Sequence, residues 1–217
     1  MITLRAGLSR SQVDAAGRLH GRLVSWRLMD TALASLSASY PDFDPTSCLI
    51  KAAAINQFYG TNVYELPAVA NHISTVMTSG QAEDLVEALA TVSLQGKTTR
   101  YVSFASKFAH FFVDETQFPI VDSYARTRLL YHLSGVSLPD PPKYADYVAA
   151  HRALIDLAAL GCSGRALDRY LWLSGLHDAW ARGERRINVE VRTLLDGAAV
   201  DSDVLRELRA LCESQDQ

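Results

Sequence analysis

Residues 94–126 read LQGKTTRYVSFASKFAHFFVDETQFPIVDSYAR and hold the features that decide both the fold and the chemistry. A turn at Gly96 separates two segments that we expect to be helical. The second of these predicted helices, 98–112, is strongly apolar and carries a lysine in its interior. An extended apolar segment follows and ends at Asp122, which we expect to cap a further helix.

The remainder of the chain shows the same helical periodicity. Prolines mark loops near residues 41–45 and 139–142. We find no two alternating β-branched runs joined by a hairpin turn, and therefore expect no sheet. The sequence predicts an all-α protein whose first helix breaks near Gly17 or Gly21. The expected helices cover residues 11–39, 45–59, 63–77, 81–92, 98–112, 122–133, 144–160, 164–182, 188–196 and 201–213.

Composition excludes several classes of protein. The chain has 217 residues, 48% of them hydrophobic and 21% charged, which rules out a disordered chain, a collagen-like chain and a coiled-coil rod. No apolar run approaches the roughly 20 residues that span a bilayer, and residues 1–10 have no apolar core of signal-peptide type. We therefore expect a cytoplasmic protein without membrane contact. Three scattered cysteines match no zinc or iron–sulfur spacing, so we expect no metal and no cofactor.

Charge is distributed unevenly along the chain. Residues 1–40 carry a net charge of +3, residues 41–93 carry −5, residues 94–132 carry +2 and residues 133–217 carry −3. Ordinary solvated helix faces account for this alternation as well as a nucleic-acid surface does. The total of −3 gives no argument for nucleic acid by itself.

The first candidate site is the turn of Gly96 with Lys97, Thr98, Thr99 and Arg100. A helix that begins here would offer free backbone N–H groups and its positive dipole end to a phosphate. The two basic side chains and the two hydroxyls would add donors. The same residues also fit a plain connection between two helices.

The second and third candidates are an amine and a carboxylate. Lys107 lies within the apolar run SFASKFAHFF, and a lysine desolvated in this way becomes a nucleophilic amine. The alternative is a stem that packs while the ammonium reaches water. His110 follows three residues later and either faces the same cavity or is a satisfied, partly buried histidine. Asp122 is either a simple N-cap or a carboxylate held beside a pocket, ready to stabilise a developing cation.

These three features, in this order, resemble the helix-hairpin-helix DNA glycosylase superfamily, and most closely its 8-oxoguanine glycosylase branch. The resemblance covers roughly residues 46–133. It implies that the hairpin grips the DNA backbone, that Lys107 attacks C1′ of a flipped nucleotide and that Asp122 assists at the sugar. The usual lysine of the family falls close to Ser103, and Lys107 lies one helical turn later on the same face.

The hairpin also departs from the family pattern, and two further assignments follow from the same resemblance. Of the family hairpin Leu-Pro-Gly-(Val/Ile)-Gly, only Leu94 and Gly96 match. The run AAINQFY is similar to the early family helix that carries an amide into the duplex, which makes Asn56 or Gln57 the wedge. The base pocket would be lined by aromatic and imidazole side chains, namely Phe58, Tyr59, His110, Phe111 and Tyr124.

The resemblance implies a two-lobed protein, with residues 46–133 in one lobe and residues 1–45 and 134–217 in the other. The expected function is a DNA N-glycosylase, with or without lyase activity. It would act as a monomer and excise a modified purine such as 8-oxoguanine from duplex DNA. Two alternatives stay open. One is a glycosylase-like enzyme acting on RNA or a nucleotide, for example in antiphage defence. The other is a helical nucleic-acid-binding module without activity.

Overall fold

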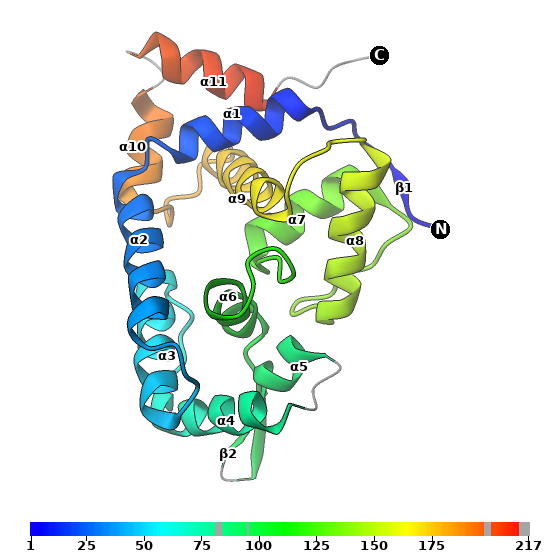
Figure 1. Ribbon diagram of the computed structural model, residues 1–217. Coiled ribbons are helices and arrows are strands. Elements are labelled where there is room, and N and C mark those ends of the chain that lie inside the picture. Colours follow the sequence, from blue (N-terminus) through cyan, green and yellow to red (C-terminus); the bar gives the residue numbers. More distant parts are fainter. Residues whose placement is uncertain (81–83, 95, 198–200, 213–217) are drawn as a thin grey trace. The chain divides into compact units, whose positions relative to one another are not determined.

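The fold is helical, as the sequence predicts. A computed structural model shows eleven helices and four short strands in the part of the chain that it describes (Figure 1). None of the described helices combines the length and the hydropathy that crossing a bilayer requires. The described residues are 1–80, 84–94, 96–197 and 201–212. Positions 81–83 and 213 of the predicted helices, and Gln95 of the quoted turn, lie outside them.

The chain divides into two compact units, each assembled from separate stretches of sequence. Unit 2 overlaps the predicted lobe 46–133 over residues 46–121. Unit 1 comprises residues 1–28, 122–138 and 147–217, and unit 2 comprises residues 29–121 and 139–146.

Unit 1 is built around α1 and α9. Figure 1 shows α1 lying between α9 and α11, and α1 contacts both helices. Two short strands, β1 (Thr3–Leu4) and β4 (Leu133–Ser134), pair antiparallel. The helices are α1 (Arg10–His20), α7 (Ser123–His132), α9 (Gly164–Ala181), α10 (Val189–Gly197), α11 (Ser202–Cys212) and most of α8 (Tyr144–Leu157), whose residues 144–146 belong to unit 2.

The start of α7 is fixed by a cap and by a close approach to α9. The Asp122 carboxylate accepts a hydrogen bond from the Ala125 N–H at 2.7 Å, which confirms the predicted helix cap. A Cβ atom added to Gly175 on α9 would lie 2.6 Å from the Tyr124 carbonyl oxygen. Glycine is therefore required at this contact, because any larger residue would push the two helices apart.

Unit 2 contains the apolar helix α6 (Val102–Phe112), which packs against α3 and α5. Helix α2 (Val24–Ser39) begins in unit 1 and continues into unit 2. Asp44 caps α3 by accepting the Thr46 and Ser47 N–H groups at 2.9 and 3.2 Å. The remaining helices are α3 (Pro45–Tyr59), α4 (Leu66–Ser79) and α5 (Leu85–Ala90).

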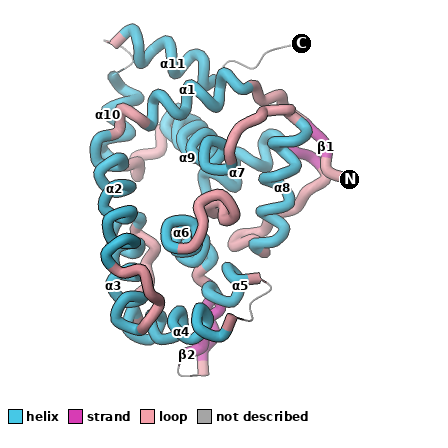
Figure 2. Tube along the Cα trace, viewed as in Figure 1, coloured by secondary structure: helices cyan, strands magenta, loops and turns pink. Residues whose placement is uncertain are grey.

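Residues 91–94 and 97–100 pair as a β-hairpin, so two expectations are wrong: that no sheet is present and that a helix begins near residue 98. Strand β2 (Thr91–Leu94) pairs antiparallel with β3 (Lys97–Arg100), and Figure 2 shows the pair in magenta. Gly96 lies in the turn with φ of 78°, a left-handed conformation that glycine adopts without steric cost.

The hairpin forms in place of a helix because the stretch around Gly96 is rich in β-branched residues. Threonine and valine lose side-chain freedom in a helix and fit a pleated strand. Val92 is buried, while Lys97 and Thr98 are exposed. Helix α6 begins only at Val102. Residues 97–100 therefore offer no helix N-terminus to a phosphate.

Candidate functional site

The candidate nucleophile is a buried amine on α6. Lys107 is 5% exposed, and its neighbours along the helix are Phe104, Ala105 and Phe108, all buried. Its Nζ donates a hydrogen bond to Ser103 Oγ at 2.7 Å. The same nitrogen lies 3.4 Å from the Val121 carbonyl oxygen, which accepts a second, longer bond. The Ser103 hydroxyl and the Val121 carbonyl thus both contribute to holding the amine in place.

The apolar segment 118–121 is anchored to unit 2 by four hydrogen bonds. His110 Nδ1 donates to the Phe118 carbonyl at 2.9 Å, and the Tyr144 hydroxyl donates to the Pro119 carbonyl at 3.1 Å. The Val121 N–H donates to Ser106 Oγ at 3.0 Å, and Lys107 bonds the carbonyl of the same residue. Helix α6 therefore fixes both backbone groups of the residue that directly precedes Asp122.

Aromatic side chains gather around the amine. Tyr59, at the end of α3, stacks on Phe111 with 5.6 Å between ring centroids. The Lys107 Nζ lies 5.7 Å from the centre of the Tyr59 ring. His110 contacts Phe111 edge to face at 4.8 Å. Three of the predicted base-pocket residues therefore share one neighbourhood with Lys107.

The predicted wedge residues lie on the last turns of α3. The Asn56 amide is committed to the following loop, because its nitrogen donates to the Val63 carbonyl at 3.0 Å and its oxygen accepts the Val63 N–H at 2.9 Å. Thr61 also donates to the Asn56 oxygen, at 2.9 Å. Gln57 is exposed and Phe58 is half-buried. Of the two amides, Gln57 is the one on the surface.

The predicted phosphate-binding residues lie on the hairpin. Thr98 bonds Ser93 across the strands, with 2.9 Å between their hydroxyl oxygens. Arg100 forms an ion pair with Glu87 at 2.8 Å and donates to the Pro142 carbonyl at 3.2 Å. Its guanidinium is thus already occupied within unit 2. Lys97 and Thr99 complete the strand, the first exposed and the second half-buried.

Asp122 and Tyr124 belong to unit 1. Asp122 caps α7, as described above. The Tyr124 hydroxyl donates to the Glu184 carboxylate at 3.2 Å. Burial, together with the negative charge of Glu184, raises the pKa of Tyr124, so this hydroxyl stays protonated at neutral pH.

A second buried lysine in unit 2 was missed by the sequence analysis. Lys51 on α3 is 1% exposed, and its Nζ donates to the Asp42 carbonyl at 2.9 Å. The ammonium also lies 4.0 Å from the centre of the Phe43 ring. Burial lowers the pKa of Lys51. The signal was present in the apolar run LIKAAAI, which resembles the setting of Lys107.

Unit 1 holds a buried polar network that no local pattern indicated. Arg128 on α7 donates to Asp178 at 2.9 Å and to the Tyr170 hydroxyl at 3.1 Å, both on α9. His132 Nε2 lies 3.0 Å from the same hydroxyl, and its Nδ1 donates to the Ala6 carbonyl at 3.0 Å. Burial lowers the pKa of His132 to about 4, so the ring is neutral and Nε2 accepts the Tyr170 proton.

A histidine–cysteine contact adjoins this network. His177 Nδ1 lies 3.5 Å from the Cys212 sulfur and 3.9 Å from the Asp178 carboxylate. Asp178, and after it Cys212, raises the pKa of His177 to about 9. Among the described residues, no group of three or more histidine, cysteine, aspartate or glutamate side chains is placed to hold a metal ion.

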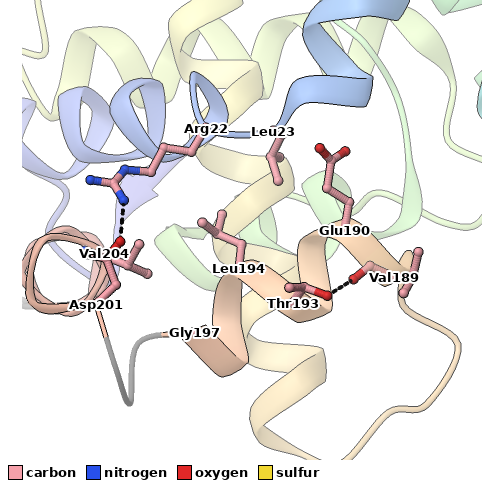
Figure 3. A pocket seen from close by; sticks show the side chains of 9 residues that line it. All are labelled: Arg22, Leu23, Val189, Glu190, Thr193, Leu194, Gly197, Asp201 and Val204. Carbon is pink, nitrogen blue, oxygen red and sulfur yellow. Dashed lines mark hydrogen bonds and ion pairs between the residues drawn. The ribbon is translucent and has the colours of Figure 1, made fainter.

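A hollow of about 540 Å³ lies on unit 1, between the end of α1 and the helices α10 and α11 (Figure 3). Its walls are largely aliphatic. Arg22 is neutralised by Asp201 at 2.8 Å, and Glu190 accepts the Ser25 N–H at 3.0 Å. None of the predicted site residues lines it. The hollow is lined by Arg22, Leu23, Val189, Glu190, Thr193, Leu194, Gly197, Asp201 and Val204.

Comparison with known proteins gives one partial match. Residues 12–116 match a family model described as HI_0787_N, an N-terminal domain. This match covers just under half of the chain, and it includes Lys107 but ends before Asp122. No curated protein and no solved structure matches the chain.

Proposed function

We propose that the protein is an N-glycosylase that acts on a modified purine nucleotide in DNA, with the amine of Lys107 as nucleophile. One observation carries the proposal: a lysine is buried on an apolar helix and oriented by Ser103 and Val121. Burial disfavours the charged form of an amine, and the neutral form is the nucleophile.

The proposed reaction joins the amine to a sugar carbon. The Lys107 nitrogen forms a bond to C1′ while the bond from C1′ to the base breaks, and the base leaves with the electron pair and takes up a proton. Loss of a proton from the attacking nitrogen and opening of the sugar ring give a Schiff base. Ser103 Oγ, 2.7 Å from the amine, is placed to orient the nitrogen lone pair.

Asp122 supplies the negative charge that the reaction needs. Positive charge builds on the sugar as the glycosidic bond breaks, and a fixed carboxylate stabilises it. The Ala125 N–H holds the Asp122 carboxylate at 2.7 Å. Four hydrogen bonds from unit 2 hold the preceding segment 118–121. The carboxylate is therefore rigidly tethered on both sides along the chain.

The aromatic neighbours of the amine suit an unstacked base. A base extruded from a duplex is held by stacking between aromatic side chains. Tyr59 and Phe111 provide such faces beside Lys107, and His110 adds an imidazole. These contacts support a nucleobase as the leaving group.

One observation favours a second candidate function. The turn at Gly96 belongs to a β-hairpin rather than to a helix-hairpin-helix, and Arg100 is occupied by Glu87. The family resemblance implied a helix-hairpin-helix as the element that grips duplex DNA, and a β-hairpin stands in its place. The same chemistry could therefore serve RNA or a free nucleotide.

Borohydride trapping tests the proposal. The parent protein is incubated with labelled duplexes, single strands and RNA that carry modified purines, and reduction converts the Schiff base into a stable secondary amine. We expect a covalent adduct with the parent and none with Lys107→Gln. Lys97→Gln, which removes an exposed lysine, and Lys51→Gln, which removes the other buried one, are the matched controls. Adducts that persist in Lys107→Gln would overturn the assignment of the nucleophile. A parent that neither traps nor excises any base on the whole panel would overturn the proposed function.

A further inference from the structure

The loop that follows α9 concentrates exposed arginines. Arg182, Arg185 and Arg186 lie within five residues, and all three are exposed. Gly183 turns the chain between them with φ of 84°. Among the described residues, no carboxylate lies within ion-pair distance of these three guanidinium groups. Three positive charges are therefore presented to solvent with no carboxylate partner in the part of the chain that the structure describes.

Some other arginines of unit 1 are paired with carboxylates. Arg10 pairs with Asp14, and Arg18 pairs with Glu207, each at 2.8 Å. An arginine paired in this way contributes little to binding an external anion, because its charge is already neutralised. The loop 182–186 differs in that three exposed guanidinium groups, none of them paired with a described carboxylate, lie within five residues.

The position of this loop connects it with the proposed chemistry. Glu184, in the middle of the loop, accepts the Tyr124 hydroxyl at 3.2 Å. Tyr124 lies in the first turn of α7, the helix that Asp122 caps. The contact of Gly175 with the Tyr124 backbone holds α9 and α7 together just before the loop. The arginine loop therefore lies beside the helix start that carries the Asp122 carboxylate.

We propose that the loop 182–186 binds the sugar–phosphate backbone of a nucleic acid next to Asp122. The guanidinium group offers a planar fork of donors that matches phosphate oxygens, and it stays charged at all physiological pH values. The loop takes the backbone-gripping role for which the hairpin residues 97–100 are poorly suited. This inference rests on the proposed function and assigns a polymeric nucleic acid as its substrate.

Charge neutralisation gives the inference a quantitative signature. Each phosphate contact releases counterions, so the logarithm of the binding constant falls with the logarithm of salt concentration by about 0.9 per contact on duplex DNA. Loss of two arginines should lower this slope by about 2 and should weaken binding roughly tenfold or more at low salt. Glu184→Gln removes the only acid in the loop and should tighten binding.

The experiment measures, by fluorescence anisotropy at several salt concentrations, how the protein binds a labelled DNA duplex of about 20 base pairs and the corresponding single strand. All variants carry Lys107→Gln, so that no covalent adduct forms, and the probes contain only unmodified bases. The loop variant Arg185→Gln/Arg186→Gln is compared with Arg152→Gln/Arg209→Gln, which makes the same change in net charge at exposed arginines on α8 and α11. We expect the loop variant alone to show the loss of affinity and slope. Equal affinities and slopes in the two double variants would overturn the inference.

The two proposals fail in distinguishable ways. If the parent traps on a nucleic acid but the loop variant binds as tightly as its control, only the arginine loop is refuted. If the parent excises a base from a free nucleotide and binds no polymer, the loop is again refuted and the glycosylase proposal survives. If binding depends on the loop but no adduct or excision occurs, the glycosylase proposal fails and the nucleic-acid surface stands.

Discussion

Unit 1 and unit 2 bury positive charge in different surroundings. In unit 1 the buried cation is Arg128, whose guanidinium bonds Asp178 and Tyr170. In unit 2 the buried basic groups are the amines of Lys51, over the Phe43 ring, and Lys107, beside the Tyr59 ring. Unit 1 contains sixteen arginines and no lysine, whereas unit 2 contains four lysines and one arginine.

The difference follows from the number and arrangement of acceptors that a guanidinium and an ammonium group each need. A guanidinium presents five donors in a fixed plane and suits a network of several acceptors. An ammonium is compact, and one or two oxygens and an aromatic face can satisfy it. Formal charge follows the same division, with +3 on unit 1 and −6 on unit 2. In unit 1 a buried guanidinium joins two helices through a carboxylate and a hydroxyl, whereas the buried amines of unit 2 lie against oxygens and aromatic rings.

The largest expected effect is on the stability of unit 1. Arg128→Met should lower the free energy of unfolding by about 2 to 4 kcal/mol, because it leaves Asp178 and the buried Tyr170 hydroxyl without their donor. Urea denaturation followed by circular dichroism measures this loss. Arg152→Met, at an exposed arginine, is the control and should change stability by less than about 0.5 kcal/mol. A loss in Arg128→Met no larger than that of the control would break the comparison.

The next largest effect is on activity, and it is tested with one residue from each unit, Asp122 of unit 1 and Lys107 of unit 2. Asp122→Asn should slow base excision by about 10²-fold or more, because the carboxylate no longer stabilises the sugar cation. Lys107→Gln should abolish trapping but leave some excision, since water can attack a cation that Asp122 stabilises. Asn also caps helices, so thermal melting of Asp122→Asn should match the parent. Excision by Asp122→Asn at the parental rate would show that the mechanism is wrong.

Acid should destabilise unit 1 through His132. Its pKa is about 4 in the folded protein and about 6.5 when unfolded, so between these values only the unfolded chain binds the proton. Stability is therefore lost as the pH falls through this window, by about 2 kcal/mol between pH 7 and pH 4.5. Urea denaturation at the two pH values measures the loss. His132→Gln should be less stable at pH 7 yet show a smaller loss on acidification. An unchanged pH dependence in His132→Gln would place the titrating group elsewhere.

The smallest expected effect is in unit 2. Lys51→Met should change the free energy of unfolding by less than about 1 kcal/mol, because a flexible apolar side chain of similar length fills the space against Phe43. The variant loses the hydrogen bond to the Asp42 carbonyl. It also no longer buries an amine whose charged form burial disfavours, as the lowered pKa of Lys51 shows, and this gain offsets the loss. The measurement is the same urea titration as for Arg128→Met. Equal losses in the two variants would show that both units depend on a buried cation.

Local signals in the sequence were sufficient for most helices. The prolines of the loop 41–45 predicted the start of α3, and Asp122 predicted the start of α7, because a capping side chain bonds N–H groups only two or three residues away. The hairpin was missed because glycine fits the break between two helices as well as a tight turn between strands. The choice depended on the β-branched residues around Gly96 and on the burial of Val92.

The site was accessible to sequence reasoning only in part. Lys107 was found because a lysine in an apolar helix is a local anomaly, and the same anomaly at Lys51 was overlooked. The Arg128 network was inaccessible, since its members come from α7, α9 and the N-terminal segment and meet only in the folded unit. The arginine loop is visible in the sequence as RGERR, but its place beside Tyr124 is not.

The discontinuous make-up of the two units has a consequence for how the protein folds as it is synthesised. The chain passes between the units four times, and unit 2 has all its residues once position 146 has been made. Unit 1 cannot close at that stage, because α1 contacts α9 and α11, which are made after all of unit 2. Helix α1 is therefore made long before its partner helices can cover it. Until the C-terminal third emerges, a nascent chain must keep Val13, Ala16 and Leu19 from finding another partner.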